Sequence, residues 1–148
     1  MEKKTYGVEE FLSRPKRLEE EIRGDLDHIA SLRSIVENRT THLSFTAGRN
    51  PSKNEKAFEN VMIQIAEEEK RLEEKQKRLV ELKLEVENYI SLLPKKNHRT
   101  FLRLKYVSGR DMTEIRDIMG LPKSTCHDLQ ESALSAARKI YYKKGNVQ

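Results

Sequence analysis

The residues best suited to chemistry in this 148-residue chain form a short run of polar side chains near its C-terminal end. Lys123, Ser124 and His127 carry hydrogen-bond donors, and Asp128 and Glu131 carry acceptors. On a helix, residues three and four positions apart lie next to each other, so the run would form one surface. Its donors suit guanine and phosphate oxygens, and a carboxylate can accept a hydrogen bond from cytosine N4. We therefore expect this surface to bind double-stranded DNA.

A rigid helix must present these side chains, and the surrounding sequence predicts a helix-turn-helix. Counted from Met112 as step 1, apolar residues fall at steps 4, 8, 10, 15 and 18: Ile115, Met119, Leu121, Cys126 and Leu129. Gly120, at step 9, allows a tight turn between two short helices that cross steeply. Asp111 and Glu114 have the spacing of an N-terminal cap for the first helix. Such a motif usually places its second helix in the DNA major groove.

Positive charge accompanies the predicted motif. From Ser91 to the end, 12 lysines and arginines face 5 acidic residues, a net charge of +7, whereas residues 1–90 carry −2 of the total of +5. Basic residues flanking the motif would add sequence-independent affinity for phosphates. Those we expect to do so are Arg99, Arg103, Lys105, Arg138 and Lys139.

The same stretch resembles region 4 of bacterial sigma factors, through Phe101-Leu-Arg-Leu-Lys-Tyr-Val-Ser-Gly109, Thr113-Glu-Ile115 and Met119-Gly-Leu121. With a long helical hairpin before it, the chain is similar to small phage-encoded regulators of the ArpU and RinA type. The resemblance implies transcriptional control of a late or packaging operon in a bacteriophage or prophage. It also implies host RNA polymerase as a further partner.

Two positions depart from that pattern. Arg116 replaces the small residue at which the two helices normally touch, so we expect its stem to pass the contact and the helices to cross more openly. Pro122 replaces the usual cap, so the second helix should begin at Lys123 or Ser124.

The preceding sequence predicts a long antiparallel helical hairpin. Residues 1–14 look weakly structured, Pro15 suits the start of a helix ending near Asn38, and 38–54 reads as a loop. A second helix is predicted from Glu55 to Leu93, with apolar residues at every heptad a position from Phe58 onward. Charged Glu68 and Lys75 occupy two of its d positions, so its seam is not a simple two-stranded zipper.

The resulting prediction is an all-α chain: a hairpin with a long coiled-coil helix over residues 1–93, then a helix-turn-helix domain over 94–148. Because the first predicted helix is the shorter, part of the second would pair with another copy, giving a homodimer or a higher homo-oligomer. We expect no enzyme, cofactor or metal site, since no phosphate loop, zinc-binding or nucleophile motif occurs. Cys126 is the single cysteine and reads as core. No stretch is apolar enough for a membrane or signal segment, which predicts a cytoplasmic protein in a bacterial host.

A second function class remains open at this point. The charged d positions and the acidic Asp128 and Glu131 also fit a helical assembly or adaptor protein whose motif binds protein. A small terminase-like packaging subunit lies between the two readings, because it would combine DNA binding with oligomerisation.

Overall fold

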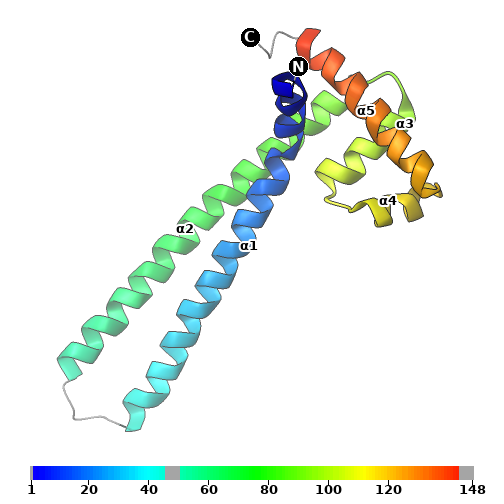
Figure 1. Ribbon diagram of the computed structural model, residues 1–148. Helices are drawn as coiled ribbons and strands as arrows, with labels where there is room; N and C mark the ends of the chain where they lie inside the picture. Colours follow the sequence, from blue (N-terminus) through cyan, green and yellow to red (C-terminus); the bar gives the residue numbers. More distant parts are fainter. Residues whose placement is uncertain (1, 46–50, 144–148) are drawn as a thin grey trace. The chain divides into compact units, whose positions relative to one another are not determined.

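A computed structural model describes residues 2–45 and 51–143 of the chain. Over these residues the fold is all-α, which confirms the predicted class (Figure 1). The helices are α1 (Glu2–Phe45), α2 (Pro51–Ile90), α3 (Lys96–Leu102), the π-helical turn η1 (Arg103–Val107), α4 (Met112–Met119) and α5 (Lys123–Lys143). None of these helices is both long and apolar enough to cross a membrane.

The chain forms two compact units, and both long helices contribute to each. The hairpin unit is Glu19–Arg78, and the motif unit is Met1–Leu18 together with Leu79–Gln148. This division differs from the predicted boundary at residue 93. The reason is that the ends of α1 and α2 carry fully buried side chains, Val8, Leu12, Val86 and Ile90, that share one apolar core with the helix-turn-helix.

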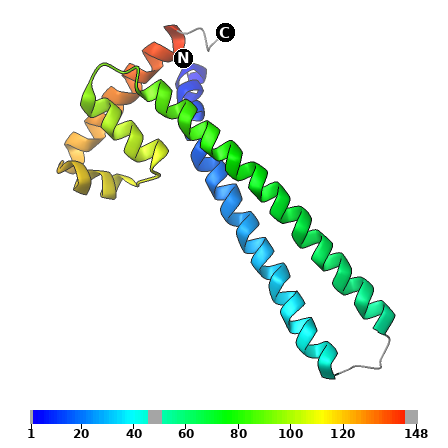
Figure 2. The ribbon, with the colours of Figure 1, turned by 180° about the vertical axis from the view of Figure 1, so that it is seen from behind.

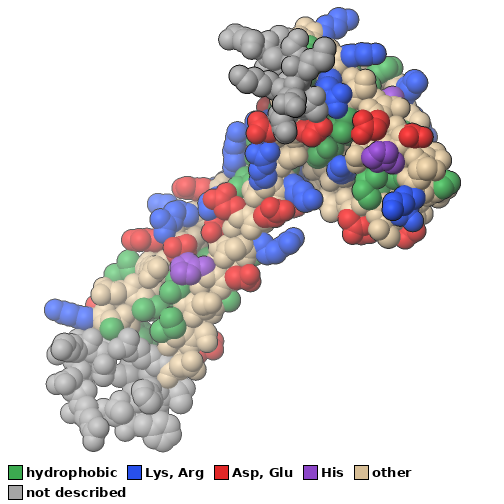
Figure 3. All heavy atoms as spheres, in the orientation of Figure 1, with side chains coloured by type: hydrophobic (Ala, Val, Ile, Leu, Met, Phe, Trp, Pro, Cys, Tyr) green, Lys and Arg blue, Asp and Glu red, His purple; other side chains and the backbone are tan. Residues whose placement is uncertain are grey.

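In the hairpin unit, α1 and α2 run antiparallel and lie side by side (Figures 1 and 2). Their facing sides bury an apolar seam in which each side chain is 6–8% exposed: Ile22, Ile29 and Leu32 on α1, Ile65 and Leu72 on α2. The α2 residues are the a positions of the predicted heptads, so the heptad pattern describes a seam within one chain. On the face drawn in Figure 3, acidic and basic side chains are interspersed along the outside of this unit.

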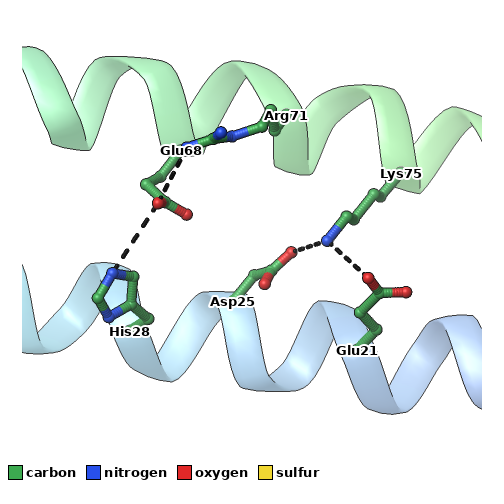
Figure 4. Close-up of polar contacts among 6 residues, drawn as sticks. All are labelled: Glu21, Asp25, His28, Glu68, Arg71 and Lys75. Atoms are coloured by element: carbon green, nitrogen blue, oxygen red, sulfur yellow. Dashed lines mark hydrogen bonds and ion pairs between the residues drawn. The ribbon is translucent and has the colours of Figure 1, made fainter.

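The two charged d positions of α2 are paired inside the hairpin (Figure 4). Lys75 Nζ donates to Asp25 at 2.7 Å and to Glu21 at 3.0 Å, both on α1. The hydrogen bonds that Lys75 donates to these carboxylates, first that to Asp25, raise the pKa of Lys75 and keep it charged. Glu68 accepts from Arg71 at 3.0 Å and lies 3.9 Å from His28 Nε2. The polar centre of the seam is thus satisfied within the hairpin.

The predicted start of the first helix at Pro15 is wrong, because α1 begins at Glu2 and contains Pro15 in its interior. Proline lacks an N–H, so it leaves the carbonyl four residues earlier without its helical donor. That carbonyl belongs to Phe11, and Arg14 Nε donates to it at 3.3 Å. Pro15 itself is fully buried. A local substitute for the missing donor, together with burial, therefore lets the helix continue through the proline.

The predicted loop over residues 38–54 is also largely wrong. α1 continues to Phe45 and α2 starts at Pro51, and only 46–50 of the predicted loop lie outside the described residues. Proline suits the first position of a helix, where its missing N–H has no helical partner to lose. The two helices span 44 and 40 residues, so the length mismatch that predicted an unpaired part of α2 does not exist.

The core of the motif unit joins all of its helices. Apart from the ends of α1 and α2, it consists of Leu93, Phe101, Leu102, Tyr106, Ile115, Cys126, Leu129, Ala133, Leu134 and Ala137. Tyr89 ties α2 to α5, because its hydroxyl donates to the Ala137 carbonyl. The ring of Phe11 packs 5.1 Å from that of Tyr89 and 5.8 Å from that of Tyr141. Dense packing of this kind holds the motif helices rigidly.

Candidate nucleic-acid interface

The helix α4 is fixed at both ends by local interactions that the sequence predicted. At its start, Asp111 Oδ1 accepts from the Glu114 N–H at 2.8 Å, and Glu114 Oε1 accepts from the Asp111 N–H at 3.3 Å. This reciprocal capping box satisfies two backbone donors. At its end Gly120 adopts a left-handed conformation with φ of 65°. A residue with a Cβ would be strained there, so glycine sets the turn into α5.

The helix α5 begins at Lys123, within the predicted range, directly after Pro122. The Cys126 N–H donates to the Pro122 carbonyl at 3.0 Å, which closes its first turn. Cys126, Leu129 and Ala133 are buried on the inner side of α5. This inner stripe fixes the rotation of the helix and turns the opposite side of α5 outward.

All five residues predicted to read DNA are exposed at the start of α5: Lys123, Ser124, His127, Asp128 and Glu131. Within the described part of the chain none of them makes a side-chain hydrogen bond or an ion pair. Lys123, Ser124 and His127 come together around a shallow hollow between α4 and α5. Their donors are therefore available to a ligand. The carboxylates of Asp128 and Glu131 lie outside the residues that line this hollow.

Arg116 and Met112, on α4, line the other side of the same hollow. Arg116 is half-buried, and its Nε atom is buried without a hydrogen-bond partner in the described residues. At Arg116, where a small residue would bring α4 and α5 into contact, the protein thus has a hollow lined by the arginine side chain. The sequence indicated the unusual residue at this step but not that it would join Lys123 and His127 around one site.

Two of the predicted flanking cations donate hydrogen bonds to other groups of the protein. Arg99 Nη1 donates to the carbonyls of Leu93 and Pro94 at 2.7 and 3.0 Å, where the chain leaves α2. Arg103 Nε donates to a carboxylate oxygen of Glu87. Both side chains therefore hold α3 and η1 to the end of α2.

The three remaining flanking cations differ from one another. Lys105 Nζ donates to Gln130 at 2.7 Å, and burial lowers its pKa. Arg138 lies 3.9 Å from Glu9. Lys139 is exposed, and no ion pair involves it within the described residues. Of the flanking cations, Lys139 is the one placed most freely for a phosphate.

A second hollow, which the sequence did not indicate, lies between the start of α3 and the second half of α5. Its polar lining is Lys95, His98, Ser132, Ser135 and Lys139. These residues come from segments some forty positions apart, so no local spacing could have revealed them. Cys126 is fully buried, and the described residues hold no group of three or more His, Cys, Asp or Glu that could bind a metal ion.

Comparison with known proteins gives a family without an assigned activity. The profile of a family described as "Protein of unknown function (DUF1492)" matches residues 45–138, which include all of α2 and α4 and the greater part of α5. No curated protein matches the chain, and no solved structure does.

Proposed function

The chain belongs to the DUF1492 family, and from the geometry of its motif unit we propose that it is a DNA-binding transcriptional regulator. The observation that carries the proposal is the start of α5, which presents exposed Lys123, Ser124 and His127 with no partner in the described residues. The glycine turn and the capping box hold α4 against this helix. Helix-turn-helix proteins use this arrangement to place the second helix in the major groove.

In the proposed complex, the first turns of α5 enter the major groove. Lys123 and His127 donate to guanine, and Ser124 donates to a base or a phosphate. Asp128 and Glu131 would meet the negative field of the backbone unless one of them accepts from cytosine N4. The two carboxylates therefore favour sites with a cytosine at that position and disfavour others.

A role in a bacteriophage or prophage, with host RNA polymerase as a partner, is the finer part of the proposal. It rests on the resemblance of roughly residues 85–140 to sigma-factor region 4 and to regulators of the ArpU and RinA type. A homodimer or a higher homo-oligomer belongs to the same proposal. Support for it now comes from side chains of the hairpin unit that are 45–57% exposed and apolar, Leu26, Ile35, Met62 and Ile63, since a second copy could cover them.

One of the two sequence features that favoured the adaptor alternative is explained within the hairpin unit. The charged d positions, Glu68 and Lys75, have partners within the hairpin and call for no external one. The acidic residues Asp128 and Glu131 remain exposed, and they still suit a protein partner. The adaptor hypothesis would be favoured if the protein had no affinity for DNA and if contacts between hairpin units set the mass of its oligomer.

Binding to labelled fragments of the protein's own genomic neighbourhood, with random DNA as competitor, tests the proposal. We expect a specific complex that weakens steeply between about 50 and 200 mM salt. Each base contact is worth about 1–3 kcal/mol, so Lys123→Ala with His127→Ala should weaken this complex about 30-fold or more. The matched control is Lys70→Ala with His28→Ala in the hairpin unit, which should bind like the wild type. Equal affinity in both double variants would contradict the proposed reading helix.

A further inference from the structure

The hollow between α3 and α5 is lined on one side by Lys95 and His98 and on the other by Ser132, Ser135 and Lys139. We call it the α3–α5 groove. Lys95, Ser132 and Lys139 are exposed, and Ser135 is half-buried. The rest of its lining is apolar, and no carboxylate is among the described residues that form it. Two ammonium groups and two hydroxyls without a counter-charge suit a ligand with anionic oxygens.

His98 adds an independent observation. It is 6% exposed, it lines the groove, and its Nδ1 atom has no hydrogen-bond partner in the described residues. A buried polar atom without a partner costs free energy that a bound ligand can recover. Burial, and secondarily Lys95, lower the pKa of His98 from its usual 6.5, so the ring is neutral at neutral pH. A neutral imidazole has one N–H to donate and adds no charge.

The groove lies on the same side of α5 as part of the proposed reading surface. Ser124, Asp128, Ser135 and Lys139 fall at intervals of four, seven and four residues, which keeps them on one helix face. At 1.5 Å per residue, Lys139 lies about 22 Å along the axis from Ser124. The major groove of B-DNA is only about 12 Å wide. A helix whose start reads bases therefore carries its second half over the flanking sugar-phosphate backbone.

We infer that the α3–α5 groove binds a backbone phosphate of the same DNA duplex that the start of α5 reads. This inference rests on the proposed function and adds to it a sequence-independent anchor outside the recognition surface. Lys95 and Lys139 supply the charge, and the Ser132 and Ser135 hydroxyls donate to phosphate oxygens. His98 positions this end of α3 against the anion.

The first test is the salt dependence of binding to a random-sequence duplex. Each neutralised phosphate contributes about 0.9 to the magnitude of the slope of log K against log salt, so Lys95→Ala with Lys139→Ala, which removes the charge that holds the one phosphate, should reduce that magnitude by about 1. The same variant should weaken specific and random DNA by equal factors. The charge-matched control is Lys56→Ala with Lys70→Ala in the hairpin unit, which should keep the wild-type slope.

The ring resonances of His98 give a second readout in the unmodified protein. Added random duplex should shift the NMR signals of His98 and leave those of His28, in the hairpin unit, in place. A shift caused by millimolar inorganic phosphate but not by duplex would make the groove a site for free phosphate and overturn the inference. So would an equal loss of slope in the two lysine variants. A wild type that binds no DNA at all would instead overturn the proposed function itself.

Discussion

The seam of the hairpin unit and the start of α5 in the motif unit use their polar side chains in opposite ways. In the hairpin, charged residues enter the seam and are paired there, with Lys75 held by Asp25 and Glu21 and Glu68 held by Arg71. In the motif unit, the described buried side chains are hydrophobic or tyrosine except for that of His98. There the polar residues at the start of α5 face outward without partners in the described residues.

This difference separates charges that fix the structure from charges that are available to a ligand. A polar layer in an antiparallel seam favours one register, because a shifted register would leave Lys75 or Glu68 without its partner. The start of α5 contributes no such pairing to the fold. Substitutions in the two units should therefore affect different measurements.

The largest stability effect should appear at high pH and in the motif unit. Burial, with a smaller effect of Glu9, raises the pKa of Tyr106 to about 12 from its usual 10.0. Between these values the unfolded chain loses a proton that the folded protein keeps. The contribution of Tyr106 to the free energy of unfolding is therefore fully present below about pH 10 and falls as the pH rises towards 12. The loss from this group is roughly 2–3 kcal/mol.

Chemical denaturation of the wild type and of Tyr106→Phe, at about pH 9 and about pH 12, measures this contribution. The hairpin unit contains no tyrosine. We expect Tyr106→Phe to be spared roughly 2 kcal/mol of the alkaline loss. An identical alkaline loss in the two proteins would show that the hydroxyl of Tyr106 is not buried in the folded state.

A smaller effect should distinguish two lysines, one in each unit. Lys75→Met keeps the apolar stem but leaves Asp25, whose side chain is 25% exposed, without its cation. For such a partly buried pair we expect a loss of about 1–2 kcal/mol in the free energy of unfolding. DNA affinity should not change. Lys123→Ala should weaken DNA binding and leave the free energy of unfolding unchanged.

The control for Lys75 is Lys77→Met on the same helix, because Lys77 pairs with Glu73 at 3.7 Å with both side chains mostly exposed. Exposed pairs contribute about 0.5 kcal/mol or less. Urea denaturation gives the free energies, and anisotropy of a labelled duplex gives the affinities. If the Lys75 variant were as stable as the Lys77 variant, the ion pairs of Lys75 would not stabilise the hairpin unit.

Alanine at a glycine position should have effects of opposite sign on the stability of the two units. A Cβ added to Gly24 or to Gly120 would meet no atom within 4 Å, so backbone conformation alone decides the outcome. Gly24 lies inside α1, where alanine should stabilise by about 1 kcal/mol. Gly120 has a φ of 65°, where alanine should cost about 1–2 kcal/mol. Melting temperatures that move in the same direction would contradict the turn geometry of the motif.

What the sequence could predict was mostly local. The capping box of Asp111 and Glu114, the turn at Gly120 and the start of α5 follow from rules that act within a few residues. The heptad positions of α2 likewise predicted the buried seam, since Ile65 and Leu72 fall on it. The exposure of Lys123 and His127 followed from the same helical periodicity.

What the sequence could not predict depends on contacts between distant segments. Pro15 was read as a helix start because nothing local shows that Arg14 would donate to the Phe11 carbonyl, or that Val8 and Leu12 would be buried. For the same reason the sequence did not show that Arg99 and Arg103 have hydrogen-bond partners on α2 and beyond its end. A count of cations cannot tell which of them the fold already uses.

Amide hydrogen exchange along the chain, with and without a duplex that the protein binds, distinguishes DNA binding by the motif unit from binding by the hairpin unit. We expect slower exchange at the start of α5 and at the α4–α5 turn, while residues 55–78 of the hairpin unit exchange as they do in the free protein. Protection confined to the hairpin, or no protection anywhere at saturating DNA, would contradict the assignment of DNA binding to the motif unit.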